Sequence, residues 1–292
     1  MSYTYQYPHP AVATDCVVFG FDGKELQILL IERGLEPFKG TWAFPGGFMR
    51  IQETAEECAQ RELREETGLT VHTLKQLGAF TSVHRDPRER VVSIAFYALV
   101  QPSDVIGGDD AKQAKWFPVD DAPPLAFDHD YILRKALQQL RKDIHFEPVG
   151  FELLNNAFTM SELQRLYEAI LGVHFDRRNF EKKMIQTGIL EPLDEEEIQA
   201  DVLYDTIIMS SDTQPALKRP TPPKSNFIGA KQEMKRMDIG ALFGSAPSET
   251  HTTMSWEEQA QRKKPGRKGR KFLFNKEKYD KFKQDNNFRL EF

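Results

Sequence analysis

Residues 47–69 constrain this chain more than any other part of its sequence, and they read GFMRIQETAEECAQRELREETGL. Three glutamates, Glu62, Glu65 and Glu66, stand at positions i, i+3 and i+4, which lie on one face of a helix. Like charges at this spacing repel each other, so a plain surface helix gains no stability from them. A hard divalent cation removes the repulsion because it binds several carboxylate oxygens. The pattern predicts a metal-binding helix, and a solvated acidic face is the alternative.

Glycines stand at both ends of this predicted helix. Gly46 and Gly47 predict a tight turn before it, because glycine adopts backbone conformations that other residues avoid. Gly68 stands where the first residue after a helix is expected, a position that also favours glycine. The spacing G-x5-E-x7-R-E-U-x-E-E-x-G-U, in which U is a bulky aliphatic residue, is met at every position of residues 47–69. The stretch therefore resembles the Nudix box.

Nudix enzymes cleave a diphosphate that joins a nucleoside to another group, and they use magnesium or manganese. The resemblance implies that Glu62, Glu65 and Glu66 are ligands of Mg²⁺ or Mn²⁺. It also implies that Arg61 orients a neighbouring glutamate and that Glu53 is a structural carboxylate. The catalytic candidates are then Glu62, Glu65 and Arg61. The physical chemistry agrees, because Mg²⁺ prefers one or two protein carboxylates together with phosphate oxygens of the substrate. The bound cation can orient a water and neutralise charge on the leaving phosphate.

Apolar runs around this stretch predict a sheet. Strand-like runs occur at Ala11–Phe21, Leu26–Arg33, 74–83, 91–100 and 115–119. Asp22-Gly23 predicts a hairpin between the first two runs. Residues 129–144 repeat leucine and isoleucine at helical spacing, which predicts a second helix. Strands that frame a central helix, with another helix on the other side, predict an α/β/α sandwich. The Nudix resemblance implies the same fold for residues 1–147.

Four residues outside the glutamate set are candidates for binding a nucleotide-derived substrate: Arg33, Gly46, Gly47 and His129. Arg33 closes the second predicted strand and could hold a phosphate, although a solvated strand end is the alternative. His129 ends the segment Ala126-Phe127-Asp128-His129. This segment and Arg85-Asp86-Pro87-Arg88 are similar to the ADP-ribose branch of the family. An ordinary residue at a helix N-terminus is the alternative for His129.

Residues 150–292 predict a second domain, after a boundary at residues 147–150 that contains a proline and a glycine. A capping box at Thr159-Met160-Ser161-Glu162 starts one helix, and Asp176 can cap the next, in which Phe180 and Met184 face inward. Residues 188–193 and Lys271–Phe274 predict two paired strands, and Asn275 can cap a last helix. The long segment between the strands, residues 194–261, is acidic at first and then polar, which predicts a largely disordered insertion.

Cationic side chains gather at two places in this second domain. The second helix carries Arg177, Arg178, Asn179, Lys182 and Lys183, and a helix of this kind after a short turn resembles a helix-turn-helix. Residues 262–271 read RKKPGRKGRK, which resembles the wing of a winged helix, with Arg267, Lys268 and Arg270 on DNA phosphates. A solvated charged face and a basic tail or localisation signal are the alternatives.

Charge and cysteine content limit which partners, metal sites and cellular compartments are expected for this chain. The chain has a net charge of −5, but residues 262–292 carry 12 Lys and Arg against 4 Asp and Glu, so only this end is expected to meet a polyanion. Two cysteines, Cys16 and Cys58, give no disulfide framework or zinc spacing, and we expect both to be buried. Residues 1–10 have neither the basic start nor the apolar stretch expected of a signal peptide, and no apolar run approaches the roughly 18 residues of a membrane helix. We expect a cytoplasmic protein with no membrane partner.

A Nudix domain followed by a winged helix resembles the Nudix-related transcriptional regulators of NAD and sugar metabolism. Members often sense ADP-ribose or a sugar through a Nudix domain whose box has decayed, whereas every box carboxylate is present in this chain. We therefore expect metal-dependent hydrolysis of ADP-ribose or a similar nucleoside diphosphate derivative, coupled to DNA-binding regulation. A non-catalytic, ligand-sensing regulator is the alternative. A homodimer is expected if the chain reads a palindrome.

Overall fold

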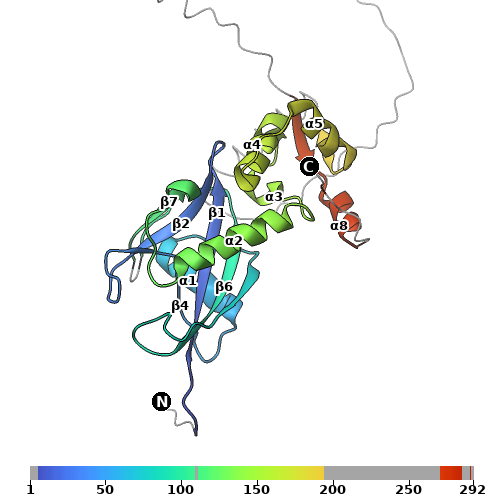
Figure 1. Cartoon of the computed structure of the whole chain (residues 1–292). Helices are drawn as coiled ribbons and strands as arrows, with labels where there is room; N and C mark the ends of the chain where they lie inside the picture. Colours follow the sequence, from blue (N-terminus) through green and yellow to red (C-terminus); the bar gives the residue numbers. More distant parts are fainter. Residues whose placement is uncertain (1–5, 109–110, 194–269, 285–289, 291–292) are drawn as a thin grey trace, which may run out of the picture. The chain divides into compact units, whose positions relative to one another are not determined.

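The fold is described from a computed structural model that covers residues 6–108, 111–193, 270–284 and 290 of the chain (Figure 1). The insertion predicted at residues 194–261 and two candidate DNA-binding residues, Arg267 and Lys268, lie outside these described residues. No helix in the described ranges is both long enough and apolar enough to cross a membrane.

A mixed sheet of seven strands organises the first part of the described chain. The strands are β1 Ala11–Phe21, β2 Leu26–Arg33, β3 Trp42–Ala43, β4 Gly46–Phe48, β5 Lys75–Phe80, β6 Val91–Leu99 and β7 Ala111–Pro118. Their order is β3-β2-β1-β6-β5, with β4 added to β1 and β7 to β2, and only β1 and β6 run parallel. The predicted hairpin between β1 and β2 is confirmed. β7 starts at Ala111, earlier than the predicted residues 115–119. The first half of the strand, AKQA, contains no large apolar residue, so the sequence pattern did not identify it as a strand.

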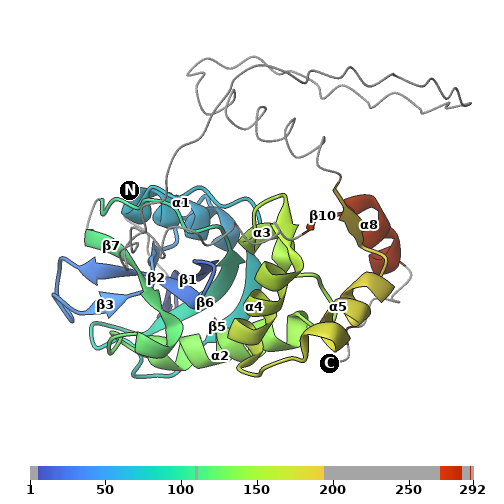
Figure 2. The same ribbon diagram turned by 90° about the horizontal axis from the view of Figure 1, so that it is seen from above.

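Helices α1 (Ala55–Thr67) and α2 (His129–Asp143) cover opposite faces of this sheet (Figure 2). Side chains alternate between the two faces along β1. Val17 and Phe19 pack in the cluster that contains Ile132 of α2, whereas Val18 packs in the cluster that contains Leu63 of α1. The α/β/α sandwich predicted from the sequence is therefore confirmed. Cys16 and Cys58 are both buried and unlinked, as predicted.

Local signals fix both ends of α1. The Thr54 hydroxyl accepts a hydrogen bond from the Glu57 backbone N–H, and the Glu57 side chain accepts one from the Thr54 backbone, which forms a capping box. Gly68 adopts a left-handed conformation with φ of 75°, and its N–H donates to the Arg64 carbonyl. The prediction that Gly68 ends this helix is confirmed, and the helix between Thr54 and Gly68 contains all three glutamates of the acidic face.

Helices α3 to α5, α8 and a small sheet make up the second part of the described chain. Their bounds are α3 Gly150–Leu153, β8 Phe158–Thr159, α4 Met160–Leu171, α5 Arg177–Gln186, β9 Leu190–Pro192, β10 Lys271–Phe274 and α8 Lys276–Gln284. The predicted caps are confirmed at Thr159, Asp176 and Asn275. β9 and β10 pair antiparallel as predicted. β8 was not predicted, because two residues give no alternating pattern, yet it pairs with the other edge of β10.

Helix α2 also contacts the second part of the chain. Leu140 and Ile144 belong to the same buried cluster as Leu163 and Leu166 of α4. The Arg141 side chain donates through Nε to the Ile170 carbonyl over 2.8 Å, which satisfies a carbonyl in the last turn of α4. The same buried cluster runs through Val149 and Leu153, so the division into 1–147 and 150–292 stays a prediction.

Candidate functional site

Arg61 lies at the centre of the acidic face of α1. Its Nη1 donates to Glu62 over 2.6 Å and to Glu65 over 3.0 Å, and its Nη2 and Nε donate to Glu53 over 2.6 and 2.9 Å. The hydrogen bond from Arg61 lowers the pKa of Glu53 to about 2, and the same partners raise the pKa of Arg61, with Glu53 as the largest cause. One guanidinium therefore offsets the repulsion between carboxylates and aligns Glu62 beside Glu65.

Strand β4 brings two glycines against these carboxylates. A Cβ on Gly47 would lie 2.4 Å from Oε1 of Glu62, and a Cβ on Gly46 would lie 2.1 Å from the Thr14 carbonyl oxygen. The Gly46 N–H donates to Oε2 of Glu66 over 2.9 Å. Neither glycine has a positive φ, so the predicted tight turn is wrong. Glycine is required because a strand backbone passes this close to its neighbours.

The three glutamates line a cavity of about 370 Å³, and each contributes hard oxygen donors of the kind that Mg²⁺ and Mn²⁺ bind. Burial raises the pKa of Glu62, although Arg61 opposes this shift. Among the described residues, no three His, Cys, Asp or Glu side chains converge closely enough to hold a metal. The reason is that Glu62 and Glu65 turn towards Arg61, while Glu66 accepts from Gly46. The donor chemistry thus fits a divalent cation, which would have to draw Glu62 and Glu65 away from Arg61.

Arginines line the same cavity as the glutamates: Arg33, Arg50 and Arg88. The guanidinium groups of Arg33 and Arg88 lie 4.8 and 5.9 Å from the centre of the Phe127 ring, and Arg88 also lies 5.2 Å from that of Phe48. Phe127 has a φ of 57°, a backbone conformation that residues other than glycine rarely adopt. The arginines can bind phosphate oxygens directly, and the carboxylates beside them can bind phosphate oxygens through a metal ion.

His129 lies behind this cavity with only 3% of its surface exposed. Its Nδ1 accepts a hydrogen bond from the Phe44 N–H over 3.0 Å, and its Nε2 lies 3.3 Å from Oδ1 of Asp15. Because Nδ1 accepts, the ring proton is assigned to Nε2, facing Asp15. Both ring nitrogens are therefore engaged within the protein, and His129 supports the segment that leads into Gly46.

A buried ion network surrounds His129. Asp15 accepts from Arg85 over 3.0 Å and from the Ser93 hydroxyl over 2.6 Å, and Arg85 also binds both carboxylate oxygens of Asp128, over 2.7 and 3.1 Å. Burial opposes the ionised form of Asp15, but His129, Arg85 and Ser93 hold its pKa well below its usual range. Sequence reasoning missed Asp15, although a lone acid inside an apolar strand is a usable signal.

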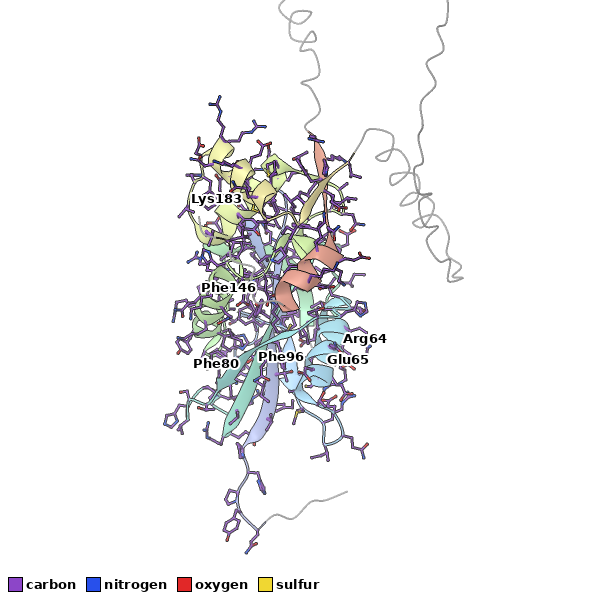
Figure 3. All side chains as sticks on the ribbon, turned by 90° about the vertical axis from the view of Figure 1, so that its right-hand side faces the viewer. Arg64, Glu65, Phe80, Phe96, Phe146 and Lys183 are labelled. Carbon is purple, nitrogen blue, oxygen red and sulfur yellow. The ribbon has the colours of Figure 1, made fainter. Side chains whose placement is uncertain are left out.

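The cationic residues predicted to bind DNA lie on the exposed side of α5, whose inner side buries Phe180 and Met184 as predicted. The exposed set is Arg177, Arg178, Asn179, Lys182 and Lys183. In Figure 3, Lys183 projects from α5 and Glu65 from α1. Arg270 is exposed immediately before β10. The described residues thus place six of the eight candidates on surfaces that a phosphate backbone can reach.

Comparison with known proteins covers both parts of the chain. The model of the NUDIX domain matches residues 9–140, and that of the NrtR DNA-binding winged helix domain matches residues 150–201. The chain is 33% identical over 197 residues to the ADPR responsive transcriptional repressor NtrR of Acinetobacter baylyi, covering 66% of this chain and 79% of that protein. It is 46% identical over 132 residues to the ADP-ribose pyrophosphatase of Methanocaldococcus jannaschii, covering 45% of this chain and 76% of that protein.

A solved structure is similar over most of the described chain. It is Shewanella oneidensis NrtR complexed with a 27mer DNA, with a TM-score of 0.53 and 29% sequence identity. The match covers 63% of this chain and 88% of that chain, so it extends beyond the Nudix-type sheet into the second part.

The role of His129 is testable by two substitutions. Asparagine places its side-chain oxygen close to the position of Nδ1 and can still accept from Phe44, whereas glutamine reaches the position of Nε2 instead. We expect His129→Gln to be less stable than His129→Asn by about 1–3 kcal/mol, the cost of a buried N–H without a partner. Urea unfolding of both variants measures the difference. Equal losses of stability would show that the hydrogen bond from Phe44 contributes no more than the contact with Asp15.

Proposed function

Since the chain belongs to the Nudix family and carries a winged helix of the NrtR type, we propose that it is a DNA-binding regulator that responds to ADP-ribose and also hydrolyses it. One observation carries this proposal: the three glutamates proposed as metal ligands line a cavity together with four arginines, in a chain whose α5 exposes a cationic face. A relative that is named as an ADP-ribose pyrophosphatase and another named as an ADPR responsive repressor support the two halves of the proposal.

The cavity supports a diphosphate as the central feature of the ligand. Arg33 and Arg88 are oriented by their contacts with the Phe127 ring, and Arg88 is also held by Asp86 over 2.7 Å. Preorganised guanidinium groups bind phosphate oxygens well because they lose little freedom on binding. Phe48, with 41% of its surface exposed, offers a flat apolar face at the edge of the same cavity. We therefore assign Arg33 to a phosphate of ADP-ribose, with Gly46 and Gly47 providing room beside it.

Hydrolysis of ADP-ribose adds one water across the diphosphate and gives AMP and ribose 5-phosphate. In the proposed reaction Glu62, Glu65 and Glu66 would hold Mg²⁺ or Mn²⁺, which would supply charge neutralisation and an activated water. Before a metal binds, Arg61 holds Glu62 and Glu65 side by side through the hydrogen bonds described above, and Glu53 fixes Arg61 in turn. His129 contributes from behind the site by holding the backbone of Phe44, next to the strand that binds Glu66.

DNA binding is assigned to α5 and to the basic residues before β10. Arg177, Arg178, Asn179, Lys182 and Lys183 are exposed on α5, and Arg270 is exposed at the strand. Lysine and arginine gain affinity for DNA by releasing counterions from its phosphates. Arg267 and Lys268 remain part of the proposal on sequence grounds. A homodimer would place two such helices on the two halves of a palindromic operator.

A non-catalytic sensor is the second candidate. It is favoured by the position of Arg61, which engages the carboxylates that a metal would need, and by the lack of a convergent acidic set among the described residues. In that case the arginines and Phe48 bind ADP-ribose without cleaving it. The following substitution distinguishes the two candidates.

We expect Glu65→Gln to lower ADP-ribose hydrolysis by roughly 10²-fold or more, the scale of losing one electrostatic stabiliser. Glutamine keeps the size and helix propensity of glutamate but removes a charge from the metal-binding set. Initial rates with Mg²⁺ measure the effect, and a thermal melt verifies folding. Glu56→Gln, on the exposed first turn of the same helix, is the matched control. Wild-type protein without any turnover would favour the sensor instead.

Replacing Arg178, Lys182 and Lys183 with alanine should weaken DNA binding and flatten its dependence on salt. The expected change is roughly 0.9 in the slope of log K against log salt for each lost phosphate contact. Binding is measured by fluorescence anisotropy with an operator duplex at several salt concentrations. A double change of Lys24 and Lys115, which are exposed on the sheet domain, is the control. An unaltered slope in the α5 variant would remove α5 from the interface.

The Glu65→Gln variant also tests coupling between ligand and DNA. A ligand shifts DNA affinity only if it binds the free and the DNA-bound protein with different affinity. We expect saturating ADP-ribose to change the operator affinity of this variant roughly 5- to 150-fold, or about 1–3 kcal/mol. The variant is used because it leaves the ligand whole. Equal DNA affinity with and without ligand would describe a hydrolase with an uncoupled DNA-binding module.

A further inference from the structure

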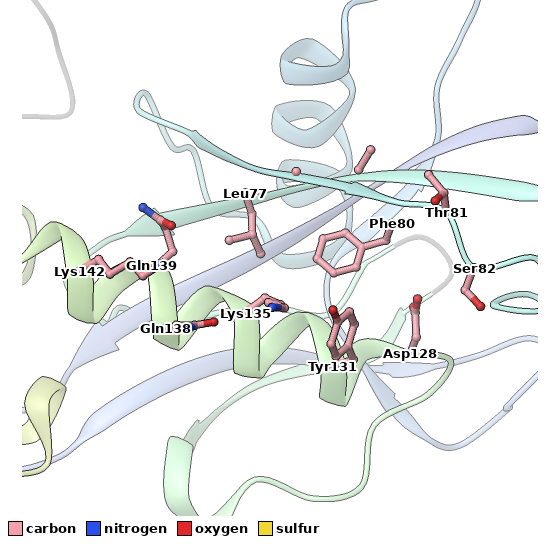
Figure 4. Close-up of a pocket in the computed structure, with 12 residues that line it drawn as sticks. Leu77, Phe80, Thr81, Ser82, Asp128, Tyr131, Lys135, Gln138, Gln139 and Lys142 are labelled. Atoms are coloured by element: carbon pink, nitrogen blue, oxygen red, sulfur yellow. The ribbon is translucent and has the colours of Figure 1, made fainter.

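A second cavity, of about 700 Å³, lies between strand β5 and helix α2 (Figure 4). β5 contributes Leu77 and Phe80 to its wall, and α2 contributes a row of polar side chains. Glu62, Glu65 and Glu66 do not line it, nor do Arg33, Arg50 and Arg88. Asp128 is its one lining residue from the buried network, and both oxygens of that carboxylate are held by Arg85. The cavity is thus separate from the proposed ADP-ribose site.

The wall formed by β5 is an exposed sheet edge. β5 ends the strand order and pairs with β6, and no strand in the described ranges pairs with its other edge. A β-bulge at Leu77 interrupts the register, which is a common protection of exposed edges. Beyond the bulge, residues 78–80 pair with β6 in regular register. This second half of β5 can therefore accept another extended chain by backbone hydrogen bonding.

The wall formed by α2 is cationic. Tyr131, Lys135, Gln138 and Lys142 stand at i, i+4, i+7 and i+11, so they form one stripe along the helix, and all four are exposed. The Lys135 ammonium lies 5.6 Å from the centre of the Tyr131 ring. Asp128 is the only acid among the lining residues, and it is already neutralised by Arg85. The groove therefore presents two cations with no opposing acid in its wall.

We propose that this groove binds an extended acidic peptide segment of a partner protein. The peptide backbone adds to the free edge of β5, and side chains on one of its faces point towards α2. Lys135 and Lys142 are seven residues apart, which is roughly 10 Å along a helix. Side chains on one face of an extended peptide repeat about every 7 Å, so acidic residues at alternate positions reach both flexible lysines. Tyr131, which packs edge-on against Phe80 at 5.9 Å, supplies an apolar contact at the end of the stripe before Lys135.

A second copy of this chain fits the groove less well than an acidic peptide. A two-fold contact between β5 edges would bring the same surface of both copies together. The Lys135 and Lys142 stripe would then face its own copy, and like charges across an interface cost affinity. Charge complementarity therefore favours an acidic partner of different sequence.

The test uses the full chain and a short fluorescein-labelled peptide that alternates glutamate and threonine. Fluorescence anisotropy measures its binding at low and physiological salt. Changing Lys135 and Lys142 together to glutamate should weaken binding by roughly tenfold or more, because two attractive charges become repulsive. The same change at Lys24 and Lys115, which lie outside the groove, is the control and should have little effect. Two further peptides carry N-methyl groups on alternate amides, one peptide for each of the two alternating sets. N-methylation removes the backbone donors that strand addition needs but leaves the charges unchanged, so it separates strand addition from charge attraction alone.

The proposal requires three results together. The glutamate peptide binds, the groove variant loses this binding while the control variant keeps it, and one N-methylated register fails to bind. The proposal is overturned if the peptide does not bind, if a lysine version binds equally well, or if both N-methylated peptides bind like the parent. Displacement of the peptide by duplex DNA, with binding lost in the α5 variant, would place the peptide on the winged helix and overturn it too. Dimers that disappear in the groove variant on sedimentation would show that a second copy occupies the groove instead.

Discussion

The acidic face of α1 depends mainly on one cation, the guanidinium of Arg61, which lies closer to the carboxylates than Arg50 does. Its hydrogen bonds to Glu53, Glu62 and Glu65 allow carboxylates to stand at helical spacing without a metal, which their mutual repulsion would otherwise oppose. Arg61 has only 11% of its side chain exposed, so these ion pairs are shielded from solvent and cost more to break than surface pairs. The capping box and Gly68 then only have to start and stop a helix in which the repulsion between carboxylates is already reduced.

Helix α2 joins the ligand cavity to the winged helix. At its first residue, His129 holds the Phe44 backbone behind the glycine strand. Near its end, Arg141 donates to the Ile170 carbonyl of α4, and Leu140 packs in the cluster shared with Leu166. A rigid element with contacts at both ends is a physical path by which ligand binding can bias the position of a second domain. Coupling between the two sites requires a second conformation in which these contacts of α2 differ.

Patterns within short segments predicted much of this structure. The box spacing predicted α1, and the apolar runs predicted β1 and β2 at every residue, because helix caps and strand alternation are local. Gly46 and Gly47 were recognised as special for the wrong reason, since their need for glycine comes from Thr14 and Glu62, which are distant in sequence. The network of Asp15 with Arg85, and the contacts of Arg33 and Arg88 with Phe127, arise only when the sheet brings loops together, so no spacing in the sequence could predict them.

Under the proposed function, the same arrangement would let ligand binding and hydrolysis respond to different signals. In the proposed function, Arg33 and Arg88 contact the diphosphate directly, and their positions are set by Phe127 and Asp86 rather than by a metal. The carboxylates instead must exchange Arg61 for a divalent cation, and breaking that ion pair subtracts from the affinity for the metal. Under this proposal, hydrolysis would depend on the metal concentration, whereas recognition of ADP-ribose would not. A chain with every box carboxylate can therefore act as a sensor whenever the metal is scarce or turnover is slow relative to DNA binding.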